Sequence, residues 1–334
     1  MQTAKKNYQE VEVMIRYIIR RVLIFIPVLL GITIIVQVLL TLAPGDPARI
    51  LVGNDAEPGV YEQVREELGL DKPIYERYWK FLSGVLKGDF GVSWTTQKAI
   101  LPEIMSRFPY TLMISTLSVI LASLIGIPLG IYAATHQYKF GDKAMILVSL
   151  ISVSMPAFWF ALLLVRLFSV QLRWLPVSGV KSWQGWILPI VSLALGYAAS
   201  IIRQMRSNML EVVRQDYITT ARAKGQSERV ILYNHALGNA LIPVIMTIGS
   251  MYGMSLGGAL IAEMIFSIPG LGSYTLTGLT NRDYPAIQST VLFLSIIFCV
   301  VMLLIDLAFA FIDPRIRSQF ARKKRTVTKK QEAQ

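Results

Sequence analysis

Six apolar stretches, separated by polar segments, follow one another along the chain. They occupy residues 22–42, 110–135, 144–171, 187–202, 241–266 and 287–312. A helix needs about 20 predominantly apolar residues to cross the hydrocarbon core of a bilayer, and five of the stretches are that long. The fourth is shorter and joins a polar segment with helical periodicity, so one helix is expected to continue from it. The pattern predicts an all-α integral membrane protein with six transmembrane helices.

The polar segments divide the chain into four parts. The predicted parts are a tail with the first transmembrane helix (1–42), an extracytoplasmic cap (43–107), a core of five transmembrane helices (108–313) and a basic tail (314–334). The cap opens on the turn Pro44-Gly-Asp-Pro47, which should end the first helix. Residues 74–85 carry an apolar stripe at helical spacing, so a helix packed on the bundle is expected there.

Charge sets the orientation. Lys and Arg number 5 before the first apolar stretch, 2 around the second turn, 6 in the segment 203–240 and 8 after Ile312, against 2 and 1 in the two short loops of the other side. Basic residues in short loops mark the cytoplasmic face. Both termini are therefore predicted to be cytoplasmic. The composition, 54% hydrophobic and 16% charged, agrees with a membrane protein, and because the net charge of +12 lies beside apolar spans, it does not indicate nucleic-acid binding.

The segment 203–240 is the longest polar interruption in the second half of the chain. Leu210, Val213, Tyr217 and Ala221 recur at helical spacing, and Gly225 stands where such a helix would stop. Val230, Tyr233, Leu237 and Leu241 then resume the period. Two short helices hinged at a glycine are predicted. They form either a solvated connector or a docking element for a soluble partner.

The chain carries no motif for enzymatic chemistry. It has no phosphate-binding Gly-x-x-x-x-Gly-Lys-Ser/Thr loop, no His-Glu-x-x-His and no Gly-x-Ser-x-Gly. Its single cysteine, Cys299, lies in an apolar stretch, and two histidines cannot assemble a zinc or haem site with it. The chain is predicted not to be an enzyme and to hold no metal, so any energy for transport must come from elsewhere.

Several short sequence motifs resemble those of a known family. Asp216-Tyr-Ile-Thr-Thr-Ala-Arg-Ala-Lys-Gly225 and His235-Ala-Leu-Gly-Asn-Ala240 resemble the cytoplasmic coupling loop of ABC importer permeases of the dipeptide, oligopeptide and nickel branch. Of the general form of that loop, only Ala221, Gly225 and Leu237 are matched. The external phrases Leu68-Gly-Leu-Asp-Lys-Pro73 and Lys87-Gly-Asp-Phe-Gly91 are similar to the first permease subunit of this branch, which has a long external loop after helix one.

The resemblance implies a permease subunit in a bacterial inner membrane. Expected partners are a second permease, two ABC ATPase subunits, an extracytoplasmic solute-binding protein and membrane lipid, with ATP and magnesium bound by the ATPases and no cofactor in this chain. The residues expected to couple to the ATPases are Asp216, Thr219, Ala221, Arg222, Ala223, Lys224, Gly225, Glu228 and His235. Those expected along the translocation path are Met155, Pro156, Trp159 and Glu263.

The substrate and the energy source leave alternatives open. Di- or oligopeptides are the expected substrates by family frequency, and nickel or another small solute is the alternative. A different class, an ion-coupled secondary transporter acting alone, would call for intramembrane acids or for broken helices in two repeated halves. Glu263 and Asp306 both lie near the ends of their apolar stretches, so the sequence favours the ATP-driven importer.

Overall fold

The computed structural model describes residues 2–53 and 58–312, and within them the regular elements are helices. The first helix is α1 (Gln2–Leu42), and the external region that follows it contains α2 (Pro47–Val52), α3 (Pro58–Glu67) and α4 (Ile74–Leu86). The core helices are α5 (Ile100–Thr135), α6 (Phe140–Ser154), α7 (Ala157–Leu164), α8 (Ile187–Val213), α9 (Asp216–Ala223), α10 (Glu228–Val230), α11 (Leu237–Gly258), α12 (Leu260–Ile265), α13 (Leu271–Thr280) and α14 (Tyr284–Ile312). Two π-helical segments, Val165–Gln171 and Ile231–Ala236, extend α7 and lead into α11.

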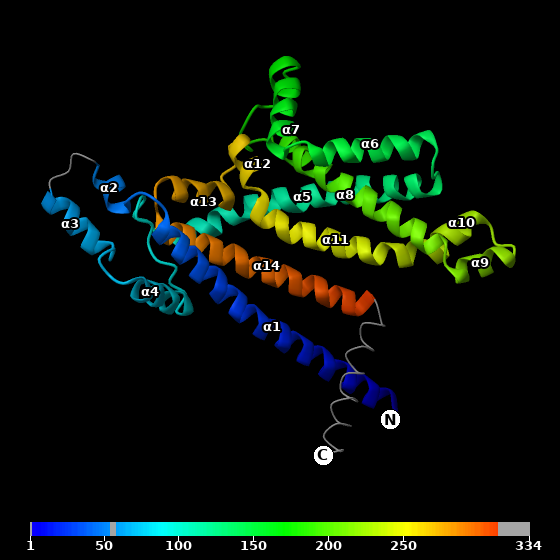
Figure 1. The fold of residues 1–334 in the computed structure, drawn as a ribbon, viewed down its shortest axis with the longest axis horizontal. Coiled ribbons are helices and arrows are strands. Elements are labelled where there is room, and N and C mark those ends of the chain that lie inside the picture. The colour runs from blue at the N-terminus through cyan, green and yellow to red at the C-terminus, as the bar shows by residue number, and fades with distance from the viewer. Residues whose placement is uncertain (1, 54–57, 313–334) are drawn as a thin grey trace.

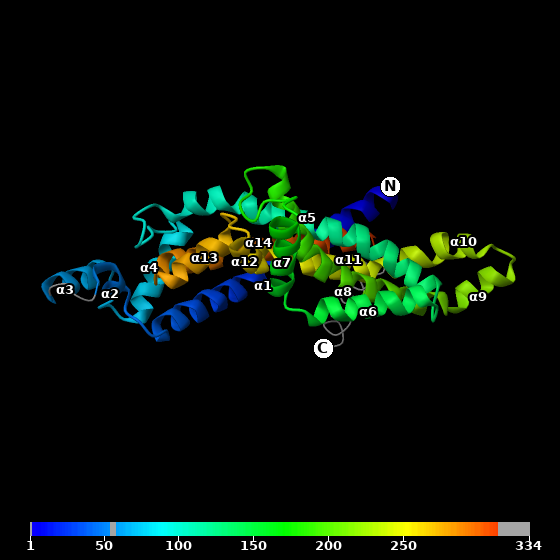
Figure 2. The ribbon, with the colours of Figure 1, turned by 90° about the horizontal axis from the view of Figure 1, so that it is seen from above.

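The long helices lie side by side in an elongated bundle, with α2 and α3 at one end and α9 and α10 at the other (Figures 1 and 2). Among the described residues, five helices are long and apolar enough to cross a membrane, or six if the bent pair α6–α7 is counted as one span. The predicted all-α architecture is confirmed. The predicted basic tail, 314–334, lies outside the described residues.

The third predicted span is not one helix. Met155 and Pro156 interrupt it, and α6 and the helix that begins with α7 meet at an angle of 103°. Proline lacks a backbone N–H and disfavours helical conformation in the residue before it, so the chain turns there. Figure 1 shows the consequence, since α7 stands across the direction of the other long helices.

Helices α5 and α8 form the centre of the bundle and approach closely because α5 carries glycines on the shared face. A Cβ at Gly126 would come within 2.7 Å of Ile201, and one at Gly130 within 2.6 Å of the Met205 Cβ. Small residues allow this approach between membrane helices. Helix α5 continues through Pro128 to Thr135 without a break.

A buried carboxylate is one of the groups that tie the external region to the bundle. Asp283, between α13 and α14, accepts hydrogen bonds from the Ser93 hydroxyl at 2.5 Å and from the backbone N–H of Trp94 at 3.2 Å. Helix α5 then begins at Ile100, so it starts within the stretch assigned to the cap and carries the chain from there through the bundle.

Candidate functional site: the cytoplasmic coupling loop

The coupling loop, residues 214–236, extends beyond the bundle at the end opposite the external helices (Figure 1). Helix α8 reaches it without a break from Ile187 to Val213, as the short fourth apolar stretch predicts. The loop returns through α10 and the π-helical segment directly into α11. A displacement of the loop is therefore applied to two long helices of the bundle at once.

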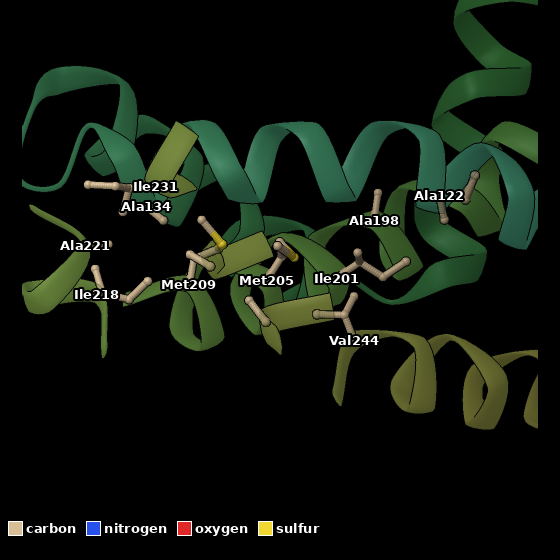
Figure 3. Packing of buried hydrophobic residues seen from close by; sticks show 13 residues of the cluster. Ala122, Ala134, Ala198, Ile201, Met205, Met209, Ile218, Ala221, Ile231 and Val244 are labelled. Carbon is tan, nitrogen blue, oxygen red and sulfur yellow. The ribbon is translucent and has the colours of Figure 1, made fainter. Parts of the chain in front are cut away.

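A small apolar core fixes the loop to the bundle. Ile218 and Ala221, one helical turn apart on α9, are buried together with Ile231 beneath the loop. This cluster is continuous with Met209 and Met205 on α8, as Figure 3 shows. Because the buried side chains come from both arms of the loop and from α8, the loop is part of the folded bundle rather than a solvated connector.

The buried register differs from the predicted one. Tyr217 was expected on the apolar face of the first arm, but it is 45% exposed, and Ile218 takes the buried position. In the second arm, Val230 and Tyr233 are exposed and Ile231 is buried. The reason is tertiary: α9 does not continue α8 but starts again after a turn, so the period counted through Val213 does not carry over.

Gly225 forms the hinge as predicted, and its role is conformational. Its φ angle is +75°, in the left-handed region, and its N–H donates to the Arg222 carbonyl at 2.9 Å. A Cβ built there would meet no atom within 4 Å. Glycine is therefore required by the backbone conformation and not by lack of space.

Two side-chain bridges hold the turn, one across the glycine and one after it. Arg222 donates two hydrogen bonds to Glu228, at 2.6 and 3.2 Å, and this carboxylate raises the pKa of the Arg222 guanidinium above its ordinary value. The His235 ring and Gln226 Oε1 lie 2.7 Å apart in a hydrogen bond. The turn is thus held as one unit, with its polar groups paired to each other.

The predicted coupling residues divide into two groups. Seven of them line the exposed side of the loop: Asp216, Thr219, Arg222, Ala223, Lys224, Gly225 and Glu228. Ala221 is only 9% exposed, so its role in the described structure is to pack α9 rather than to present a surface. His235 is half-buried and holds Gln226.

The base of the loop is braced by an ion pair that the sequence reading missed. Arg206 on α8 contacts Asp142 at the start of α6 through two hydrogen bonds, at 2.5 and 2.8 Å, and the Asp142 side chain is 1% exposed. Asp142 also accepts from the backbone N–H of Tyr138 at 2.9 Å. Basic residues of the loop were counted only for topology, and nothing in the local sequence indicates which acid pairs with Arg206.

Glu263, predicted on the translocation path, is instead fully buried at the outer end of the bundle. Its carboxylate accepts from the Thr111 hydroxyl at 2.6 Å and from the backbone N–H of Ser273 at 2.9 Å, in the first turn of α13. A Cβ at Gly270 would collide with this carboxylate. Glu263 therefore joins α12, α13 and α5, and in the described structure it faces no open path.

The other three predicted path residues lie at the bend of the third span. Met155 and Pro156 separate α6 from α7, and Trp159 follows in the first turn of α7, about half-exposed. They are neighbours in the sequence, whereas Glu263 is buried on α12. Their place on a path remains a prediction.

The fold is a bundle of helices long and apolar enough to span a membrane, with a packed helix pair extending from one end, and the comparison with known families gives its class as a membrane transport permease. The chain belongs to the family described as binding-protein-dependent transport system inner membrane component, whose model matches residues 126–318. A second model, for the N-terminal part of these membrane components, matches residues 14–115. The expectations of a permease, an inner membrane location and a transport rather than enzymatic role are confirmed by this family.

The curated relatives match almost end to end. The chain is 39% identical over 304 residues to the glutathione transport system permease protein GsiC of Escherichia coli K12, covering 91% of this chain and 99% of the relative. The GsiC protein of Shigella dysenteriae gives the same values. An inward-facing structure of the MetNI methionine ABC transporter matches 64% of this chain and 98% of its own with a TM-score of 0.56 at 18% identity, which supports the shared fold.

Proposed function

We propose that this chain is the permease subunit of an ATP-driven importer that carries small peptides, including glutathione-like tripeptides, into the cell. The observation that supports the substrate class is the end-to-end similarity to glutathione permeases at 39% identity. Family membership supports dependence on an extracytoplasmic binding protein. An ion-coupled transporter acting alone would not need such a protein.

The coupling loop is the proposed docking site for an ATPase subunit. Its exposed residues lie on α9 and at the hinge, and the buried Ile218 and Ala221 prevent the loop from yielding separately from α8. A second permease of related fold would carry the corresponding loop for the second ATPase. ATP and magnesium would be bound by those subunits, and this chain would bind no cofactor.

The mechanism follows from this rigidity. Helix α8 packs along α5 over much of its length, with side chains of α8 seated against Gly126 and Gly130. When the ATPases close, displacement of the loop would move α8 and the helices packed on it as one body. A ligand shifts such an equilibrium only if it binds the two conformations differently, so the ATPases must favour the outward-facing one when ATP is bound.

The test is reconstitution of the complete transporter in proteoliposomes with its binding protein. Glutathione, a dipeptide, a hexapeptide and a nickel chelate would be offered separately, with ATP inside or absent. We expect ATP-dependent uptake of glutathione or the dipeptide, and ATPase activity that rises when the loaded binding protein is added. Uptake of the nickel chelate alone would overturn the peptide assignment, and uptake driven by an ion gradient without ATP would overturn the importer.

A further inference from the structure

Helix α4 of the external region carries an exposed apolar face. Tyr75, Trp79 and Leu86 are 70%, 67% and 80% exposed, and at 3.6 residues per turn they share one side of the helix. Glu76 and Lys80 lie on another side and are also exposed. Large apolar side chains gathered on one face of an amphipathic helix mark an interaction surface.

Two hydrogen bonds place α4 against the outer end of α1. The hydroxyls of Tyr78 and Thr33 lie 3.0 Å apart, and Arg77 Nη2 donates to the Thr41 hydroxyl at 3.2 Å. Thr33 and Thr41 are eight positions apart, about 12 Å along a helix. Since neighbouring residues of α4 reach points so far apart on α1, α4 crosses α1 rather than running along it, over the outer third of the apolar span that ends at Leu42.

The same two bonds show which side of α4 faces the membrane. Tyr78 reaches toward the middle of the α1 span, and Arg77 reaches toward its outer end. On the helical wheel, Tyr75, Trp79 and Leu86 lie on the Tyr78 side, whereas Lys80 lies on the Arg77 side. The apolar face is therefore turned toward the bilayer and the charged side toward the external water.

We infer that α4 lies in the outer interface of the membrane, with Tyr75, Trp79 and Leu86 seated in the lipid at the boundary between headgroups and acyl chains. Tyr and Trp are enriched at this boundary, and helices with one aromatic, apolar face and one charged face lie in its plane. The occupant of the face is thus the lipid around α1. A binding protein arriving from the external side would meet the Glu76 and Lys80 side.

In this arrangement α4 sets the height of the external region above the bilayer. It is joined to α1 on one side and leads on the other to the segment that Asp283 holds at the top of α14. Helices α2 and α3 then stand farther out, as Figure 1 shows. The lipid contact would hold this region steady where substrate is delivered.

The experiment uses the single cysteine of the chain, Cys299, which is buried and is replaced by alanine. In that background, Tyr75→Cys, Trp79→Cys and Leu86→Cys are compared with Glu76→Cys and Lys80→Cys. Each variant receives a nitroxide spin label in the assembled transporter, reconstituted in phosphatidylethanolamine and phosphatidylglycerol vesicles. Collision with apolar oxygen and with a water-soluble nickel chelate is then measured by electron paramagnetic resonance.

We expect the oxygen-to-nickel accessibility ratio at 75, 79 and 86 to be several-fold higher than at 76 and 80. Leu39→Cys on the exposed side of α1 provides the lipid reference, and Glu66→Cys on the exposed side of α3 provides the water reference. A ratio at 75, 79 and 86 equal to the water reference would overturn the proposal. Low accessibility to both reagents would also overturn it, because a protein would then cover the face. Leu86, at the end of α4, keeps the test valid if the Trp79 variant does not assemble.

Discussion

Replacement of Gly225 isolates the contribution of the hinge conformation to coupling. At φ +75°, any residue with a Cβ is strained, and we expect about 1–2 kcal/mol for alanine and more for the β-branched valine. That cost lowers the population of the native turn about 5- to 30-fold relative to relaxed alternatives. A clash with neighbouring atoms does not add to this free-energy cost, because no atom lies within 4 Å of the Cβ position.

A relaxed turn would separate Arg222 from Glu228, whose ion pair spans the glycine. The exposed side of the loop would then no longer present one fixed surface to the ATPase. We expect Gly225→Val to insert and assemble normally, to retain ATPase activity and to lose most uptake per ATP hydrolysed. Uptake and hydrolysis are measured on the same proteoliposomes, with binding protein added.

Asparagine is the matched control for this prediction. It tolerates the left-handed region far better than valine, although it adds more atoms than alanine. Gly225→Asn should therefore stay close to the parent, and Gly225→Ala should fall between the parent and valine. Normal coupling in the valine variant would refute the conformational argument, and so would an asparagine variant as defective as valine, because side-chain size rather than backbone strain would then decide.

Three further predictions concern the side-chain bridges. Arg206→Ala leaves Asp142 buried and unpaired, so the transporter should lose about 3–5 kcal/mol of stability, measured by thermal unfolding in detergent, and a second change, Asp142→Ala, should recover part of the loss. Glu263→Ala leaves two donors without an acceptor and should cost about 1–3 kcal/mol for each, whereas unchanged melting would contradict its role as a brace. Arg222→Glu should reduce uptake, and the double variant with Glu228→Arg should restore it, because the ion pair is then re-formed with reversed charges. A double variant as defective as the single one would contradict this role and show that the charges act on another group.

The membrane-spanning helices were predictable from the sequence because each depends on residues that are close together in the chain. An apolar stretch must be helical in lipid, since every backbone polar group has to be satisfied within the segment. The charge of the short loops orients each span. The turn at Gly225 was likewise predictable, because a glycine that follows a stretch of helical periodicity indicates the end of the helix.

The partners of polar side chains were decided by tertiary structure. The sequence predicts Glu263 on the translocation path, and only the folded chain shows that its carboxylate is bound by a threonine 152 positions earlier and by the turn at Ser273. Arg206 was counted as one more cytoplasmic charge, and only the return of α6 beside α8 gives it Asp142. Such contacts join elements far apart in sequence, and periodicity carries no information about them.

The apolar stretches were therefore enough to predict the membrane-spanning helices, and the sequence motifs were enough to predict the family of transport permeases to which the chain belongs. The orientation of the spans, which rests on the charge of the short loops, stays a prediction. The packing of distant elements makes Ile218 rather than Tyr217 the anchor of the coupling loop and makes α4 cross α1, whereas the turn of the third span at Pro156 follows from the local chemistry of proline. The difference arises because the two kinds of feature depend on interactions over different distances along the chain. Helix formation and membrane insertion depend on neighbouring residues, whereas burial and polar pairing depend on which surfaces the folded chain brings together.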